Sequence, residues 1–213
     1  MPLLLPPNWL RLLIIVLLLL SVFFRFVNLG RKFYWKDEAF TSSRSAYTKT
    51  ELVEQIFQGN NIGIRDIQTY QHLNSEKSVI DIKGLAVEEH ILPPLYFVIL
   101  RFWVQLFGDS VAVIRSLSVL ISLLVFPCLY WLCLELFQSS LTGWVAIALI
   151  AVLPFHLLYA QEARPYILWI LTILLSSATL LYAMRRKTGF SWTIYAVSLS
   201  LGLYSFLFTG LVD

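Results

Sequence analysis

Long stretches of apolar residues are the feature that most limits what this chain can fold into. A helix that crosses a membrane needs about 20 mostly apolar residues, and Trp9 to Leu29 meets that requirement with an uncharged centre. Hydrophobic residues make up 58% of the 213 positions and charged residues 14%, whereas soluble domains carry roughly 25% charged residues. We therefore predict an integral membrane protein.

Five segments have the composition expected of membrane spans. They lie at about residues 9–29, 111–137, 141–160, 167–184 and 192–212. Pro127 and Pro154 fall inside two of them, which membrane helices tolerate better than soluble ones. No small-residue cleavage site follows the first segment, so we expect a retained anchor. The predicted fold is an all-α polytopic transmembrane helical bundle that forms a single membrane domain.

A charged loop, from about residue 30 to residue 110, separates the first span from the second. Thr48–Glu51 matches a helix capping box, and the apolar stripe that follows it predicts an amphipathic juxtamembrane helix within Ala39–Phe57. Pro94–Phe107 is apolar, but it is too short to span a bilayer. We expect it to lie at the membrane surface as well.

The orientation of the chain follows from this assignment. If Pro94–Phe107 does not cross, the short connection Arg185–Lys187 faces away from the long loop, and its positive charges favour the cytoplasm. The loop then lies outside, on the same face as the connection that carries Glu162. Two acidic motifs, Asp37-Glu38 and Glu162, should therefore face each other across one extracytoplasmic surface.

Charges near the first span oppose this orientation, since Arg25, Arg31 and Lys32 follow it and only Arg11 precedes it.

Other features of the composition exclude several classes of function. The net charge of +3 includes no basic block, so no nucleic-acid partner is expected. Cysteine spacing gives no metal motif or disulfide framework. Later spans are nearly free of ionisable residues, which disfavours a small transporter.

An ordered set of motifs between residues 34 and 166 resembles a known family. Its members are Asp37-Glu38, Pro93-Pro94-Leu95-Tyr96, Leu106-Phe107-Gly108, Arg115 and Gln161-Glu162-Ala163-Arg164. Together they resemble the GT-C membrane glycosyltransferases of the protein O-mannosyltransferase and aminoarabinose transferase kind. Members usually have a histidine directly before the two prolines, whereas Ile91 and Leu92 intervene after His90 here. Relatives continue through many more spans, so the chain is expected to be an N-terminal portion.

The resemblance implies sugar transfer at the outer face of the plasma membrane. The donor would be a polyprenyl-phosphate sugar held in membrane lipid, and the acceptor would be a lipid, a glycan or a protein. Such chemistry needs a carboxylate to take the acceptor proton and cations beside the departing phosphate. The residues implied as catalytic are Asp37, Glu38 and Glu162, and those implied as substrate-binding are Arg115, Arg164, Lys83 and His90. These carboxylates could also hold Mg²⁺ or Mn²⁺, although the resemblance favours no obligatory ion.

Simpler interpretations of the same residues stay open. Asp37 could cap a helix that starts near Ala39, and Glu162 could stand at a helix entrance beside Pro165. Arg115 and Arg164 occupy positions from which arginines reach lipid headgroups. A non-catalytic membrane subunit with the same fold is the alternative to an enzyme, and only the enzyme requires the Asp37 carboxylate.

Overall fold

The computed structural model describes residues 7–46 and 93–211, and its regular elements in these ranges are all helical. The elements are α1 (Asn8–Phe26), α2 (Lys36–Ala46), α6 (Leu95–Phe107), α7 (Val111–Phe137), α8 (Ser140–Val152), α9 (Pro154–Ala160), α10 (Tyr166–Arg186), α11 (Gly189–Ser205) and the 3₁₀ helix η2 (Leu207–Leu211). The predicted all-α bundle is confirmed. Lys83, His90 and the helix expected after the capping box lie outside the described residues.

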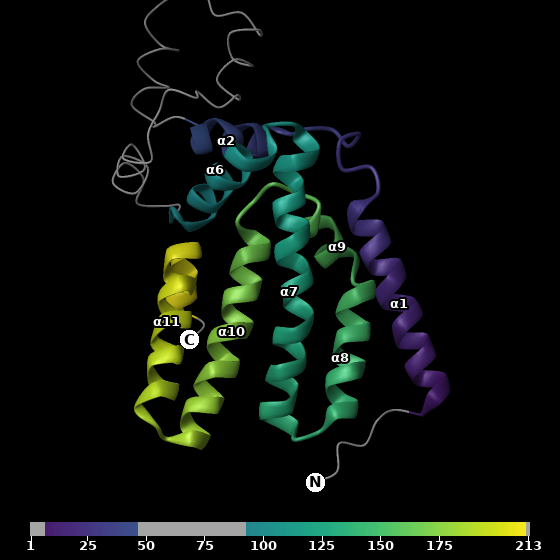
Figure 1. Cartoon of the computed structure of the whole chain (residues 1–213), viewed down its shortest axis with the longest axis vertical. Coiled ribbons are helices and arrows are strands. Elements are labelled where there is room, and N and C mark those ends of the chain that lie inside the picture. Colours follow the sequence, from purple (N-terminus) through teal and green to yellow (C-terminus); the bar gives the residue numbers. More distant parts are fainter. Residues whose placement is uncertain (1–6, 47–92, 212–213) are drawn as a thin grey trace, which may run out of the picture.

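The long helices stand side by side, and the short helices α2 and α6 lie together at one end of them (Figure 1). Along the bundle, α7 packs between α8 and α10, α10 packs against α11, and α1 packs mainly against α8. The connection from α9 to α10 returns to the end that carries α2 and α6. The turns from α7 to α8 and from α10 to α11 lie at the opposite end (Figure 1).

Fewer helices than predicted are long enough to span a membrane. Among the described residues, α1, α7 and α10 are sufficiently long and apolar, and α8 with α9 would make a fourth span if the two are taken together. These two helices are bent by 67° at the break between them. The difference from the five expected spans lies in this bent pair and in α11.

Proline breaks one predicted span and leaves another intact. Pro154 begins α9, and Leu153 before it is extended, with φ −68° and ψ 117°. A residue that precedes proline is disfavoured in the helical region, so the span predicted at 141–160 divides there. Pro127, in contrast, lies within the continuous helix α7.

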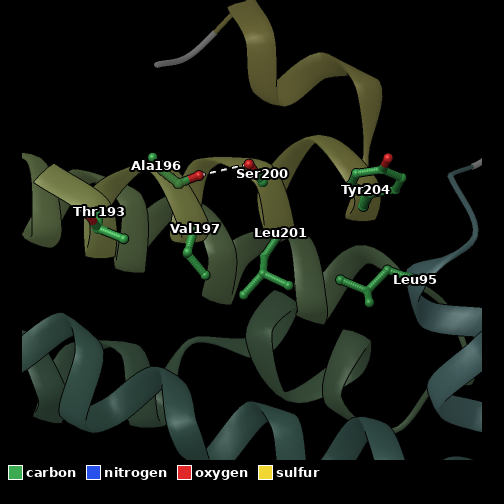
Figure 2. Close-up of a pocket in the computed structure, with 7 residues that line it drawn as sticks. All are labelled: Leu95, Thr193, Ala196, Val197, Ser200, Leu201 and Tyr204. Atoms are coloured by element: carbon green, nitrogen blue, oxygen red, sulfur yellow. Dashed lines mark hydrogen bonds between the residues drawn. The ribbon is translucent and has the colours of Figure 1, made fainter.

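The predicted span at 192–212 is also discontinuous. Helix α11 has 17 residues, about 25 Å of helix, which is less than the roughly 30 Å of a hydrocarbon core. After Tyr204 the chain turns back over α11 (Figure 2). The Thr209 hydroxyl donates to the Gly202 carbonyl at 2.9 Å, and the Trp169 indole donates to the Thr209 hydroxyl at 3.1 Å.

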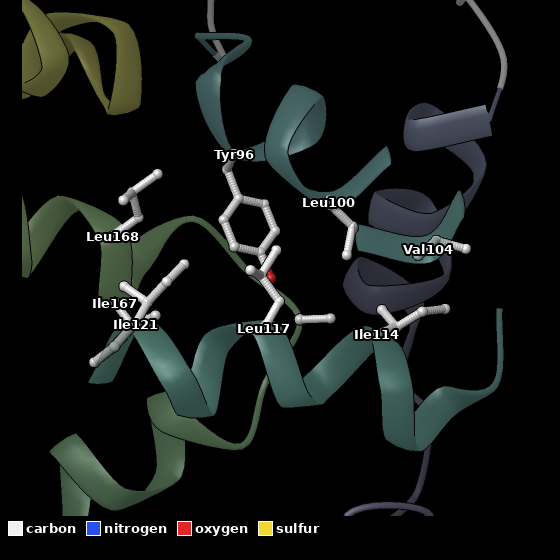
Figure 3. Close-up of a cluster of buried hydrophobic side chains, with 9 residues drawn as sticks. Tyr96, Leu100, Val104, Ile114, Leu117, Ile121, Ile167 and Leu168 are labelled. Atoms are coloured by element: carbon white, nitrogen blue, oxygen red, sulfur yellow. The ribbon is translucent and has the colours of Figure 1, made fainter. Parts of the chain in front are cut away.

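The short helix α6 is fixed by a core that it shares with α7 and α10. Its side chains Tyr96, Leu100 and Val104 pack on residues of both long helices, and Ala163 of the α9–α10 connection belongs to the same cluster (Figure 3). The Tyr96 hydroxyl also meets the Ser118 hydroxyl at 2.7 Å. Pro94–Phe107 is thus a short helix at the end of the bundle, and its orientation to the membrane stays a prediction.

Polar caps define where the helices begin at each end of the bundle. The side chains of Ser110, Ser139 and Thr188 accept N–H groups at the first turns of α7, α8 and α11. Such caps satisfy donors that have no partner within the helix. Gln138 and Lys187 close α7 and α10 with left-handed φ values of 54° and 53°. Capped and sharply turned ends of this kind allow consecutive helices to run antiparallel.

Candidate active site

A buried ion pair stands where α2 meets α7. The Arg115 Nε atom donates to Glu38 Oε1 at 2.8 Å, and its Nη2 atom donates to Oε2 at 2.7 Å. Both side chains are about 1% exposed. Two parallel bonds between a guanidinium and a carboxylate are stronger and more directional than a single contact. Glu38 and Arg115 therefore hold α2 in one position on α7.

The rest of the Arg115 guanidinium binds the segment between α1 and α2. Nη1 donates to the carbonyls of Leu29 and Lys32 at 2.6 and 3.2 Å, and Nη2 donates to the Phe33 carbonyl at 3.0 Å. With the two bonds to Glu38, all five N–H donors of this arginine have acceptors. Because these groups are already engaged, the geometry favours a positioning role over the phosphate contact that the resemblance implied.

Glu38 also fixes the connection between α9 and α10. The backbone N–H of Ala163 donates to Glu38 Oε1 at 3.0 Å, across 125 positions of sequence. Ala163 lies directly between Glu162 and Arg164, so this bond brings both residues to the start of α2. The two acidic motifs thus lie close together at one end of the bundle, whereas their location on the extracytoplasmic face stays a prediction.

Asp37 has a different environment from its neighbour. Its side chain is 39% exposed, and its Oδ2 atom lies 3.8 Å from Nη2 of Arg164, whose side chain is 9% exposed. Arg164 Nη1 also donates to the Asp37 carbonyl at 3.2 Å and to the Thr41 hydroxyl at 3.3 Å. Arg164 thus holds the first turn of α2 and leaves the Asp37 carboxylate partly open.

Asp37 does not cap a helix that starts near Ala39. Helix α2 begins at Lys36, and the Trp35 carbonyl accepts the N–H groups of Glu38 and Ala39 at 3.1 Å each. Asp37 and Glu38 both lie in the first turn, where the helix dipole favours negative charge. The cap interpretation is therefore wrong. The helix begins at Lys36 instead of near Ala39, so Asp37 lies inside its first turn.

Glu162 is the third acidic residue at this end. It is partly buried, and its Oε2 atom has no hydrogen-bond partner among the described residues. Burial raises the pKa of this carboxyl, and the charge of Glu38 raises it further, while Lys32, Arg164 and Arg115 lower it. Glu162 thus lies just before the entrance of α10 with one buried carboxyl oxygen that has no partner among the described residues.

The fit to a divalent cation depends on how many carboxylates are free. Both oxygens of Glu38 are held by Arg115 and Ala163, which leaves Asp37 and Glu162 as oxygen donors. The described parts of the chain contain no group of three His, Cys, Asp or Glu residues placed to hold a metal. These residues do not fit a complete protein site for Mg²⁺ or Mn²⁺.

Several contributing residues were not singled out by the motifs. The Thr41 and Tyr166 hydroxyls accept hydrogen bonds from Arg164, and Lys36, which directly precedes Asp37, is exposed. The adjacency of Lys36 to the acidic pair was a visible indication. The hydrogen bond of Thr41 gave none, because its partner Arg164 lies 123 positions away in the sequence.

The fold and this site define a helical membrane protein with an arginine-held acidic pair at one end of its bundle. A model of the dolichyl-phosphate-mannose-protein mannosyltransferase family matches residues 92–212, more than half of the chain. The chain belongs to this family of GT-C type glycosyltransferases. No curated protein and no solved structure matches it.

Removing one partner of the buried ion pair should strongly destabilise the protein. Glu38→Gln leaves the Arg115 guanidinium buried without a counter-charge, and we expect a loss of about 3–5 kcal/mol in the free energy of unfolding. Thermal and denaturant unfolding of the detergent-solubilised chain measures this. The control is Glu135→Gln, because its partner Arg185 is 46% exposed although Glu135 is only 10% exposed, and a cation that water can reach leaves a smaller loss than a buried one. Equal losses in both variants would contradict the assignment.

The raised pKa of Glu162 predicts how stability depends on pH. The folded protein holds this proton more tightly than the unfolded chain, whose ordinary value is 4.5. Stability is therefore highest below that value and falls as pH rises through the interval up to the raised pKa. Glu162→Gln removes this loss of stability, so the melting temperature of the variant should rise relative to that of the wild type as pH increases. A difference that is constant between about pH 4 and 8 would show that Glu162 is not shifted.

Proposed function

We propose that the protein transfers a sugar from a polyprenyl-phosphate donor to an acceptor hydroxyl at the extracytoplasmic face of the membrane. Asp37 is the proposed general base. The family membership supports a glycosyltransferase. The observation that carries the finer proposal is the contrast within the acidic pair: Glu38 is buried and paired, while the Asp37 carboxylate is 39% exposed at the end of the bundle.

The proposed step assigns the proton and the electrons as follows. The acceptor oxygen forms a bond to the anomeric carbon of the sugar, and the bond from that carbon to the phosphate oxygen breaks. The phosphate leaves with the bonding pair, and the acceptor proton passes to Asp37. A base within hydrogen-bond reach of the acceptor contributes to the rate in this way. Arg164, 3.8 Å from Asp37 Oδ2, orients the carboxylate for that contact.

Charge that develops on the departing phosphate needs cations nearby. Lys32, four residues before α2, and Lys36, its first residue, are exposed, and we propose that they take this role together with Lys83 and His90, which lie outside the described residues. Arg115 and Glu38 are assigned as positioning residues, because their polar atoms are satisfied by one another and by backbone. Glu162, whose buried Oε2 atom has no partner among the described residues, is assigned to bind a hydroxyl group of the sugar or the acceptor.

The face of the membrane is inferred from the charges at the opposite end. Arg185, Arg186 and Lys187 lie at the turn between α10 and α11, away from α2 and α6 (Figure 1), and short positively charged connections favour the cytoplasm. In the sequence, the positive charge of Arg25 after the first predicted span opposed this orientation. Its side chain is 0% exposed within the bundle, so it does not act as an interfacial charge.

Replacing the proposed base should separate catalysis from stability. Asp37→Asn keeps the size of the side chain, and it should lower the transfer rate by roughly 10²–10⁴ while the melting temperature changes little. The assay is transfer from a labelled polyprenyl-phosphate sugar in proteoliposomes that contain the full chain. Asp109→Asn, an acidic residue between α6 and α7 at the same end, is the control and should leave the rate nearly unchanged. Full activity in Asp37→Asn would remove the assignment and favour a non-catalytic subunit.

The orientation is tested by cysteine labelling in sealed cells. Native Cys128 and Cys133 are first replaced by alanine, and single cysteines are then introduced as Phe33→Cys and Lys187→Cys, both at exposed positions. An impermeant maleimide should label the first variant directly and the second only after permeabilisation. The reverse pattern would place the acidic site in the cytoplasm.

A further inference from the structure

A helix that breaks inside a bundle leaves backbone groups without partners, and α1 satisfies one of them here. Because α8 ends at Val152, carbonyl groups of its last turn lack the N–H groups of a continuing helix. The Ser21 hydroxyl of α1 donates to the Ala151 carbonyl at 2.8 Å. In a lipid environment a break of this kind requires such compensation.

Arg25, one turn further along α1, holds the other side of the break. Its Nη2 atom lies 2.7 Å from His156 Nδ1 in α9, and its Nε atom donates to the Ser122 hydroxyl of α7 at 3.1 Å. Nη1 donates to the Ser21 carbonyl at 3.0 Å and also contacts the Ser21 hydroxyl. A guanidinium is only a donor, so His156 accepts through Nδ1 and carries its proton on Nε2. One side chain thus joins α1, α7 and α9.

The partners of Arg25 in the described part of the chain are neutral, and its guanidinium also lies 4.9 Å from the centre of the Phe126 ring. The side chain is 0% exposed. Burial of a cation without a carboxylate is costly, and apolar residues would usually pack at least as well. An ionisable residue at such a position indicates a functional requirement. The contacts of Arg25 indicate that the requirement here is to hold α1, α7 and α9 in fixed relative positions.

Gln161, at the end of α9, links the end of α1 to the α9–α10 connection that carries Glu162. Its Nε2 atom lies within hydrogen-bond distance of the carbonyls of Phe24, Arg25 and Val27, at 2.5, 3.3 and 3.2 Å. Glu162 and Ala163 follow directly. The connection is therefore held on one side by the end of α1 and on the other side by the bond from the Ala163 N–H to Glu38.

We infer that Arg25 is a positioning residue of the site: through His156 and α9 it sets where Glu162 and Arg164 stand relative to Asp37. In its consequence for catalysis this inference rests on the proposed function, but the placement itself does not. Arg25 touches no residue of the acidic pair. It acts at the break between α8 and α9, where Ser21 binds the end of α8 and Arg25 binds α9.

Hydrogen exchange of the full chain in nanodiscs tests the placement without reference to activity. In Arg25→Gln, the peptide that contains residues 161–166 should exchange roughly tenfold faster, because the Ala163 N–H loses its fixed partner more often. Peptides from α7 and α10 should keep their protection. Arg11→Gln removes a charge from the opposite end of α1 and is the matched control, with no change at residues 161–166.

His156→Phe provides a second variant should Arg25→Gln fail to fold, since it removes only the contact with α9 and keeps those with α1 and α7. It should give the same local increase in exchange. Unchanged exchange at residues 161–166, or an equal increase in every helix, would overturn the inference. In the transfer assay, both variants should lower kcat by about 10- to 100-fold at unchanged KM for the donor. A failure of Asp37→Asn to affect transfer would count against the proposed base and would leave the exchange result intact.

Discussion

The bidentate pair between Glu38 and Arg115 is the interaction on which the arrangement of this end of the bundle depends. It binds α2 to α7, the segment after α1 through three carbonyls, and the α9–α10 connection through the Ala163 N–H. A buried carboxylate and a buried guanidinium are each unfavourable alone, so the three segments must close around both together. The acidic site exists only as long as this closure holds.

Two adjacent acidic residues acquire different roles because a helix turns by about 100° per residue. In the first turn of α2, this rotation directs Glu38 into the bundle and leaves Asp37 partly exposed beside Arg164. The buried residue holds the turn in place, and its exposed neighbour is the residue that we propose as the base. If Asp37 is the base, as we propose, the ion pair of Glu38 contributes by keeping its carboxylate on a fixed helical turn.

The second support lies inside the bundle, at the break between α8 and α9. Ser21 and Arg25 supply hydrogen bonds to both sides of the break, and Gln161 ties the far end of α9 to α1. The connection that carries Glu162 is thus held from two directions. A continuous helix through Pro154 would have carried this connection elsewhere, so the bend and the site belong to one arrangement.

The sequence by itself determined the membrane class, the helical fold and the common location of the two acidic motifs, because hydrophobic length is a local property that can be read from the residues. The number of spans was not determined in this way, since five were predicted and the described residues contain three, or four if α8 and α9 are taken together. It also placed Pro94–Phe107 as a short helix. The tertiary structure decided which acidic residue is buried, that Arg115 serves Glu38, and that α8 breaks at Pro154 whereas α7 continues through Pro127. Each of these outcomes depends on partner atoms from segments far away in the chain, and no local pattern records which distant carbonyl, hydroxyl or carboxylate will be close enough to form the bond.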